Sequence, residues 1–312
     1  MLDYKLVEAL ATVVAEGGFE RAGRVLGLTQ SAVSQRVRLL EEAAGRVFLV
    51  RSTPPRPTAA GHEMLTLYRQ VRHLEDDLSA RLGLESSGFA TLAVGINADS
   101  LATWFFPAVD GFLDSEPVLL DLRVDDQAQT HTLLRNGEVL GCISDRAEPM
   151  QGCAVHVLGE MHYRLYGTSA YQARWFPSGV TREAVPGAPM LIFNRKDVMH
   201  ATLLAQALGS EPPGYTPFYL PSSEQFAPAI ASGRVCGMLP DEQANGLVAC
   251  GELVDLLPGH AFTVSLHWHC WNLETGVLTR FTRALVAGAR RLLARDESSG
   301  RPCPQAAHGV QR

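Results

Sequence analysis

The chain has 312 residues, of which 46% are hydrophobic and 19% are charged, and its formal net charge at pH 7 is −6. This length and composition exclude a largely disordered chain and fit a soluble protein with two or three domains. No apolar run approaches the roughly 18 residues of a membrane span, and Met1 to Gly18 lacks the basic start and the apolar block of a signal peptide. We therefore expect a cytoplasmic protein that has no membrane partner.

The first part of the chain predicts three short helices. Asp3 to Glu16 carries an apolar stripe at helical spacing, and Phe19 to Leu26 predicts a second helix that Gly27 ends. Thr29 is of a type that caps helices, and it precedes a third helix from Gln30 to about Ala43. The inward face of this third helix is predicted from apolar residues at helical spacing, namely Val33, Val37 and Leu40.

The opposite side of the third helix is polar, and an arginine- and proline-rich loop follows it. Gln can pair with adenine, Arg can pair with guanine, and small Ser hydroxyls let a helix lie close in a major groove. No carboxylate occurs between Glu42 and Glu63, and prolines stiffen the loop, so it suits a positively charged wing beside a recognition helix. An ordinary amphipathic surface helix is the alternative. The residues predicted to bind double-stranded DNA are Thr29, Gln30, Ser31, Ser34, Gln35, Arg36, Arg38, Arg51 and Arg56.

Thr58 can cap a long helix that ends at about Leu82. The apolar residues of this helix recur alternately three and four apart, which is the spacing of a heptad seam. An isolated helix of this length is unstable in water, so the seam needs a cover, either the chain's own body or a second copy. A homodimer or homotetramer is favoured, because helix-turn-helix proteins read paired half-sites. The seam consists of Met64, Leu67, Val71, Leu74 and Leu78.

After Glu85 to Phe89, which is a linker by composition, the pattern changes from helical to alternating. The order strand, helix, strand, helix, strand argues for a mostly parallel sheet with helices on both faces, in which ligands bind at the carboxyl ends of strands. These predicted elements are strands over Thr91–Ile96, Leu119–Val124 and Val139–Ser144 and helices over Ser100–Leu113 and Gln129–Asn136.

A second unit of the same type follows. Its predicted strands are Arg164–Gly167, Met190–Phe193, Tyr215–Tyr219 and Val235–Leu239. A strand over Phe262–Trp271 and a helix over Leu273–Leu293 then rejoin the first unit, and the two crossings between the units lie near Gly159 and Val264. The resulting lobes are residues 90–160 plus 265–295 and residues 161–264. Asp296 to Arg312 has no apolar period and predicts a disordered tail.

The segment Leu28 to Gly61, LTQSAVSQRVRLLEEAAGRVFLVRSTPPRPTAAG, resembles the winged helix-turn-helix of LysR-type transcriptional regulators. Further runs are similar to the arginine- and lysine-responsive ArgP/LysG branch of that family, and the likeness extends from Tyr4 to about Leu293. These runs are VRSTPPRPT, NADSLATW (Asn97 to Trp104), RNGEVLGCIS (Arg135 to Ser144) and PSSEQF (Pro221 to Phe226).

The resemblance implies an α/β protein with three parts. An all-α winged helix-turn-helix over residues 1–60 and a linker helix over residues 61–84 precede a two-lobed, periplasmic-binding-protein-like effector domain over residues 90–295. The resemblance also implies a regulator of genes for basic amino-acid export or metabolism, with RNA polymerase as a further partner. Some members of the branch inhibit the initiation of chromosome replication.

A basic amino acid presents one carboxylate and two positive groups, so its site needs hydrogen-bond donors for the first and acidic side chains for the others. Asp99 with Ser100, and Ser222 with its neighbours, lie where a predicted strand turns into a helix, which places free backbone N–H groups beside a hydroxyl. The residues predicted to bind the effector are Asp99, Ser100, Ser144, Asp145, Asn194, Asp197, Ser222, Ser223 and Glu224. The alternative is that the serines and Asp99 only cap helices and that the other acids are solvated.

Enzyme, cofactor and metal sites are not expected. The chain has no G-x-S-x-G elbow, Walker loop or H-E-x-x-H motif. On a strand, His267 and His269 face one side and Cys270 faces the other, so packing is favoured over a metal site. Two alternatives to a ligand-responsive regulator stay open, a cytoplasmic amino-acid-binding protein and a sequence-tolerant DNA binder of the replication-inhibitor type.

Overall fold

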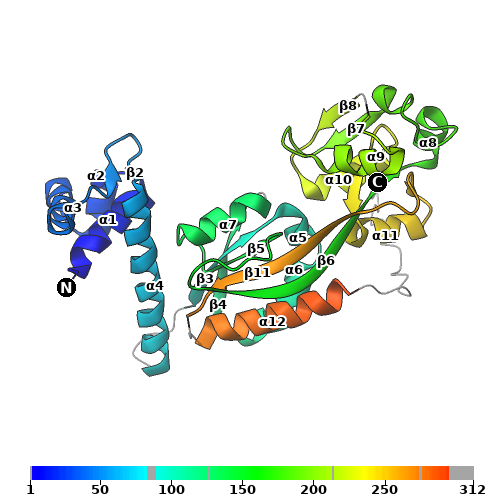
Figure 1. Cartoon of the computed structure of the whole chain (residues 1–312). Helices are drawn as coiled ribbons and strands as arrows, with labels where there is room; N and C mark the ends of the chain where they lie inside the picture. The colour runs from blue at the N-terminus through cyan, green and yellow to red at the C-terminus, as the bar shows by residue number, and fades with distance from the viewer. Residues whose placement is uncertain (1, 83–88, 126, 213, 274–275, 295–312) are drawn as a thin grey trace, which may run out of the picture.

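The structure is a computed structural model that describes residues 2–82, 89–125, 127–212, 214–273 and 276–294. A small N-terminal unit, one long helix and a larger two-lobed α/β domain follow one another along the chain (Figure 1). The predicted linker before Phe89 and the predicted tail from Asp296 to Arg312 lie outside the described residues. Among the described helices, none is both long and apolar enough to span a membrane.

Three helices and a two-stranded hairpin form the N-terminal unit. They are α1 (Tyr4–Glu16), α2 (Phe19–Leu26), α3 (Gln30–Ala44), β1 (Leu49–Val50) and β2 (Arg56–Pro57). Asp3 caps α1 and Thr29 caps α3, each by accepting a backbone N–H, and Gly27 ends α2 at φ 64°, which glycine adopts without strain. The three predicted helices are confirmed, and α3 is one residue longer than expected.

The core of this unit is the predicted one. Val33, Val37 and Leu40 are at most 2% exposed and pack in one cluster with Leu10 and Val13 of α1. Burying these aliphatic side chains holds α3 against α1, at about 1.5–3 kcal/mol for each fully buried side chain. The polar side of α3 is thereby turned outward.

The long helix α4 (Ala59–Leu82) begins where the capping residue predicted it. The Thr58 hydroxyl accepts the N–H of Gly61 at 3.0 Å and donates to the carbonyl of Val47 at 2.7 Å, so it caps α4 and ties it to the hairpin. Leu65 is buried in the N-terminal core. Three members of the predicted seam face outward, since Leu67, Leu74 and Leu78 are 43%, 44% and 52% exposed, whereas Met64 packs against the N-terminal core.

The α/β domain is built on nine strands. They are β3 (Ala90–Ile96), β4 (Val118–Val124), β5 (Gly141–Ser144), β6 (Cys153–Gly167), β7 (Pro189–Ile192), β8 (Thr216–Tyr219), β9 (Cys236–Pro240), β10 (Val254–Asp255) and β11 (Phe262–Trp271). Strands β4, β3 and β5 pair in parallel in one lobe, and β9, β7 and β8 pair in parallel in the other. Both lobes therefore have the predicted parallel strands.

Two long antiparallel strands, β6 and β11, join the lobes, and Figure 1 shows them running from one lobe into the other. The hydrogen-bonded order is β4-β3-β5-β11-β6-β9-β7-β8, so the domain has one continuous mixed sheet instead of the two separate, mostly parallel units that we predicted. Gly159 and Val264, where the crossings were predicted, lie within these two strands. Only the last four residues of β6 were predicted, because Gly159 and its polar neighbours interrupt the apolar pattern.

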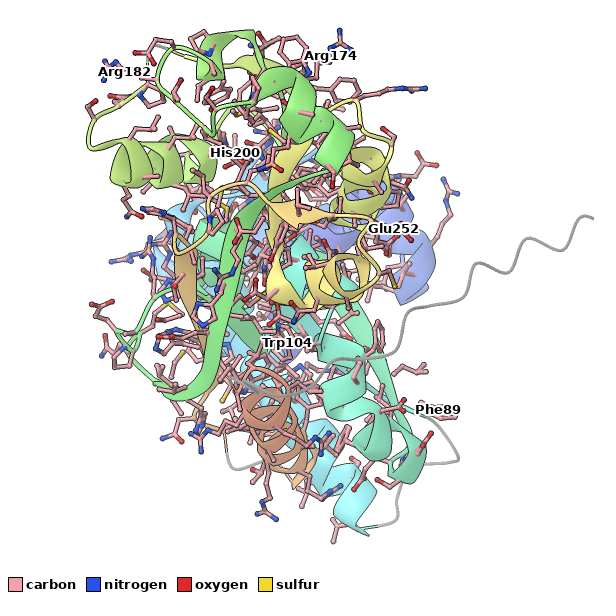
Figure 2. The ribbon with its side chains drawn as sticks, turned by 90° about the vertical axis from the view of Figure 1, so that its right-hand side faces the viewer. Phe89, Trp104, Arg174, Arg182, His200 and Glu252 are labelled. Atoms are coloured by element: carbon pink, nitrogen blue, oxygen red, sulfur yellow. The ribbon has the colours of Figure 1, made fainter. Side chains whose placement is uncertain are left out.

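Eight helices cover the described sheet. They are α5 (Ala98–Ala102), α6 (Phe105–Ser115), α7 (Gln127–Arg135), α8 (Ser169–Trp175), α9 (Met199–Leu208), α10 (Ser223–Ala231), α11 (Asp241–Ala249) and α12 (Gly276–Leu292), with a short 3-10 turn at Val185–Gly187. The prediction of a single helix over Ser100–Leu113 is wrong, because the helix is interrupted between α5 and α6. Pro107 explains the break: it lacks an N–H and would clash inside one long helix, but it fits the first turn of α6. Trp104 fills the break and lies inside the domain (Figure 2).

Candidate functional site

The outward side of α3 carries polar side chains beside the hairpin. Ser31, Gln35 and Arg38 are exposed, and Ser34 and Arg36 are half-buried. A hollow of about 500 Å³ separates the start of α3 from the hairpin loop, and Gln30, Ser34 and Arg51 are among the residues that line it. The structure thus brings the predicted helix residues and the loop arginine Arg51 to one face. Thr29 and Arg56 are exposed at the edges of the same region.

The arginines of this face are available for an external anion. None of Arg36, Arg38, Arg51 and Arg56 forms an ion pair with another described residue, whereas Arg24 pairs with Glu20 at 2.9 Å. Unpaired arginines beside serine hydroxyls and a helix start are the groups that bind phosphate oxygens and base edges of DNA.

Glu41 fixes the hairpin relative to α3, and sequence reasoning missed it. Its Oε1 accepts the N–H of Phe48 at 2.9 Å and the N–H of Leu49 at 3.2 Å. Both donors belong to buried residues, so the carboxylate satisfies backbone groups that water does not reach. In the sequence Glu41 looks like any acid of an exposed helix face, and only the folded hairpin reveals its partners.

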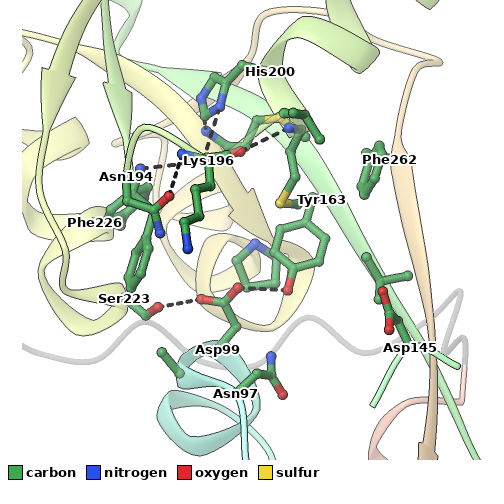
Figure 3. A pocket seen from close by; sticks show the side chains of 18 of the residues that line it. Asn97, Asp99, Asp145, Tyr163, Asn194, Lys196, His200, Ser223, Phe226 and Phe262 are labelled. Atoms are coloured by element: carbon green, nitrogen blue, oxygen red, sulfur yellow. Dashed lines mark hydrogen bonds and ion pairs between the residues drawn. The ribbon is translucent and has the colours of Figure 1, made fainter. Parts of the chain in front are cut away.

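A second and larger cavity of about 990 Å³ lies between the two lobes of the α/β domain (Figure 3). In one lobe, three parallel strands each end at an acidic side chain of its lining: Asp99 follows β3, Asp125 follows β4 and Asp145 follows β5. In the other lobe the lining comes from the loop after β7, from the starts of α9 and α10, and from β9 and α11. Ligand sites at the carboxyl ends of parallel strands are the rule for such sheets.

Asp99 connects the two lobes across this cavity. Its carboxylate accepts hydrogen bonds from the Ser223 hydroxyl of the other lobe at 2.5 Å and from the Tyr163 hydroxyl of β6 at 2.8 Å. Burial raises the pKa of Asp99, the two hydrogen bonds oppose that rise, and nearby Asp197 adds to it. A cation that enters the cavity would therefore relieve an unfavourable buried negative charge.

Asp197 and His200 form a second buried group on the wall. Asp197 accepts the N–H groups of Phe193 and Met199 at 3.4 and 2.9 Å, which fixes its carboxylate. His200 accepts the N–H of Met238 through Nε2 at 3.2 Å, and its Nδ1 lies 3.9 Å from Asp197. Burial lowers the pKa of His200, and Asp197 opposes this only in part, so the imidazole is neutral.

Cations occupy one part of the lining. Arg195 and Lys196 both come from the loop after β7, and Figure 3 shows the Lys196 side chain extending into the cavity. Arg195 lies over the ring of Tyr219, with 5.0 Å between the guanidinium carbon and the ring centroid. The described lining thus combines four aspartates with two cations and with apolar walls from Phe193 and Phe226. This mixture suits a small zwitterion that carries an additional positive charge.

The nine residues predicted for this cavity divide into two groups. Asp99, Asp145, Asn194, Asp197 and Ser223 line it. The others do not: Ser100 and Ser144 are fully buried beneath the surface, Ser222 is the half-buried residue before α10, and Glu224 is exposed.

Sequence reasoning also missed lining residues. Lys196 and Arg195 share the strand-end loop of Asp197, so the same argument could have found them. Tyr163 lies in the part of β6 that the pattern did not predict, and no local signal marks it. Among the described residues, no group of three or more His, Cys, Asp or Glu side chains gathers as a metal site would require.

Two family models match the chain. The model for bacterial regulatory helix-turn-helix proteins of the lysR family matches residues 4–62, and the model for the LysR substrate binding domain matches residues 87–293. The chain belongs to the LysR family. The helix-turn-helix face and the interlobe cavity thus lie one in each of the two matched family domains.

Relatives with assigned names are similar over nearly the whole chain. The HTH-type transcriptional regulator ArgP of Pseudomonas aeruginosa is 44% identical over 291 residues, which cover 93% of this LysR-family chain and 96% of the relative. ArgP from Mycobacterium tuberculosis has a crystal structure with a TM-score of 0.86, 36% identity and coverage of 94% and 99% of the two chains. Full-length LysG from Corynebacterium glutamicum, solved with bound effector Arg, gives a TM-score of 0.77, 33% identity and coverage of 93% and 99%.

These comparisons establish the general activity. This chain is a helix-turn-helix transcriptional regulator with an effector-binding domain. Proteins of this kind act by binding DNA and small molecules, and they are not enzymes.

Proposed function

We propose that a basic amino acid, arginine or lysine, occupies the interlobe cavity and changes how this regulator binds its operator. The observation that supports this most directly is the charge pattern of the lining, in which aspartates end three neighbouring strands while two cations face them from the other lobe. Such a lining matches a ligand with one carboxylate and two positive groups. The bound arginine of the LysG relative supports the same class of ligand.

Each group of the ligand has a counterpart. Lys196 and the backbone N–H groups at the start of α10 bind the carboxylate, because Lys196 extends into the cavity and a helix start presents free N–H groups. Asp99 and Asp197 bind the α-ammonium, since both are fixed by hydrogen bonds and Asp197 lies near enough to raise the pKa of Asp99. Asp145 receives the distal cation, with Asn194 as a further polar contact.

DNA binds at the other end of the molecule. The polar side of α3 enters the major groove with Ser34, Gln35 and Arg38 toward base edges, and Thr29, Gln30, Ser31 and Arg36 support that contact. Arg51 and Arg56 of the hairpin contact phosphates. The parts are a winged helix-turn-helix over residues 1–60, a linker helix over 61–84 and an effector domain over 90–295. The regulator works as a homodimer or homotetramer at promoters of amino-acid export or metabolism genes, together with RNA polymerase.

The effector is tested by a thermal-shift screen of the twenty amino acids. A ligand at 100 times its Kd stabilises the folded state by about 2.7 kcal/mol, so arginine or lysine should raise the Tm selectively. Asp99→Asn should remove the shift, and Glu224→Gln, an acid outside the cavity, should keep it. A Tm that no basic amino acid raises would refute the proposed effector.

The DNA contact is tested separately by gel shift and calorimetry. Arg38→Ala should weaken operator binding by about 1–3 kcal/mol and leave amino-acid affinity unchanged. Loss of amino-acid affinity with intact operator binding would contradict this division of roles. DNA affinity that does not respond to arginine or lysine would favour the sequence-tolerant binder instead.

A further inference from the structure

The turn directly after α7, at Asn136 and Gly137, docks against the linker helix α4. Arg69 of α4 donates from Nη1 to the carbonyl of Asn136 at 3.0 Å. Gly137, the next residue, adopts φ +65°, and a Cβ there would lie 2.7 Å from the Cα of Thr66. Burial at this contact lowers the pKa of Arg69, and Glu138 partly opposes the effect. The two elements therefore touch through backbone and through a largely desolvated guanidinium.

The contact uses a face of α4 that the exposed seam does not use. Thr66 and Arg69 lie three residues apart and share one side of the helix. Leu67, Leu74 and Leu78 form the neighbouring stripe and are exposed. A second copy of the chain can cover the seam while α7 stays docked on α4.

The turn that contacts α4, Asn136 to Glu138, is itself attached to the sheet. Asn136 donates from Nδ2 to Glu138 at 3.1 Å, and Arg123 of β4 pairs with the same Glu138 at 3.4 Å. Arg123 immediately precedes Val124, which lines the interlobe cavity. A displacement of this strand end is therefore transmitted to the turn that holds Arg69.

The start of α7 is attached to a second strand end of the cavity. Thr130 donates from its hydroxyl to the carbonyl of Ile143 in β5 at 2.8 Å. The ring of His131 lies 5.1 Å from the ring of His269, whose Nε2 is 2.7 Å from the carbonyl of Arg146. Asp145, which lines the cavity, stands directly before Arg146. Contacts at both ends thus connect α7 to the cavity on one side and to the linker helix on the other.

We propose that α7 transmits effector occupancy to the DNA-binding unit and that the contact of Arg69 with Asn136 and Gly137 is the joint through which it acts. The proposal rests on the proposed function of the cavity. A ligand shifts DNA binding only by its different affinities for two arrangements of the molecule, and a helix attached at both ends gives those arrangements a physical connection. Without the joint, effector binding in the cavity and operator binding by the N-terminal unit would be independent of each other.

The test uses the full-length protein, arginine and an operator selected from random-sequence DNA. Arg69→Met removes the donors but keeps the apolar stem, and Arg72→Met, an exposed arginine of the same helix, is the matched control. Calorimetry measures the Kd of arginine with and without bound operator. The ratio of the two values is the coupling, about 5- to 150-fold for typical allosteric proteins. In Arg69→Met the two Kd values should differ by less than about twofold, which means that the sites are no longer coupled. Arg72→Met should keep the wild-type ratio.

Arg69→Met with a wild-type ratio would overturn the proposal. Gly137→Ala should uncouple the sites from the opposite side of the joint, because its Cβ would push α7 away from Thr66. If the wild-type protein binds neither arginine nor lysine, the proposed effector is wrong. Amide exchange of the ligand-free protein then tests whether Arg69 holds α4 against the turn after α7. Exchange in α4 around Arg69 should rise in Arg69→Met but not in Arg72→Met, and equal exchange in both variants refutes it.

Discussion

Single polar groups that are wholly or partly buried fix the geometry of both sites. Glu41 holds the hairpin against α3 by accepting two backbone N–H groups, and Asp99 holds the two lobes together by accepting two hydroxyl groups. His200 stays neutral beside Asp197 because burial opposes its protonation. Each of these groups is more costly to leave unpaired than an exposed one, so single substitutions there have measurable effects.

Removing Glu41 should loosen the DNA-binding unit. Glu41→Ala leaves the N–H groups of Phe48 and Leu49 without a partner, and we expect it to lower the free energy of unfolding by about 2 kcal/mol. Glu42→Ala, at an exposed position, should change it by less than about 0.5 kcal/mol. Chemical denaturation of the full chain, with amide exchange across β1, measures the difference, and equal values for the two variants would contradict this role of Glu41.

The buried imidazole of His200 predicts a pH dependence of stability. An unfolded histidine takes up a proton near pH 6.5, whereas folded His200 has a lowered pKa and stays neutral further into the acid range. The unfolded state therefore binds more protons below about pH 6.5, and stability should fall as the pH falls through this window. His200→Gln keeps an acceptor for Met238 and should flatten the decline between about pH 6.5 and pH 5 in urea titrations. A decline in His200→Gln as steep as that of the wild type would contradict this role of His200.

At the scale of elements, close packing of α12 on α6 holds the first lobe. Gly288 of α12 faces Ala108 of α6, and a Cβ at Gly288 would lie 2.3 Å from the Ala108 carbonyl oxygen. Phe281 of α12 packs against Trp268 of β11 and Phe112 of α6 at ring-centroid distances of 5.7 and 5.4 Å. The helix pair therefore tolerates no added atom along this line.

Two glycines of this pair should respond in opposite directions. Gly288→Ala forces the helices apart and should destabilise the protein by about 1–3 kcal/mol. Gly111→Ala, on the open side of α6 where nothing lies within 4 Å, should stabilise it by about 0.5–1 kcal/mol because alanine restricts the unfolded chain. Thermal unfolding measures both, and a loss of stability in Gly111→Ala would show that this side of α6 is not free.

At the scale of the whole molecule, we predict that the exposed leucines of α4 form the contact between two copies of the chain. An exposed stripe of this kind is costly in water and matches the seam of a two-stranded helical contact. Two joined DNA-binding units would also read two half-sites at once, which raises operator affinity.

Introducing a charge into the seam tests this assembly. Leu74→Glu should dissociate the oligomer and weaken binding to a two-half-site operator, because a carboxylate cannot be buried unpaired in the seam. Val248→Glu places the same charge at an exposed apolar residue of α11 and should leave the mass unchanged. Analytical ultracentrifugation gives the masses, and an unchanged mass for Leu74→Glu would exclude α4 as the contact between copies.

The sequence by itself determined the features whose signals are local. Thr29 and Thr58 cap the helices that they were expected to cap, because a capping bond spans only a few residues. Alternating and helical periods likewise placed most strands and helices, since burial of one face acts on each segment separately. The resemblance of these segments to LysR-type regulators is confirmed by the family to which the chain belongs.

Only the tertiary structure decided which polar residues meet. Asp99 and Ser223 are 124 positions apart and share a hydrogen bond, while Ser100, next to Asp99, is buried beneath the cavity. Spacing could not separate these two neighbours, because both lie in the first turn of α5 and only the position of the other lobe decides which side chain meets it. Long-range contacts depend on how strands cross and pair, and that geometry is a property of the whole sheet instead of any one segment.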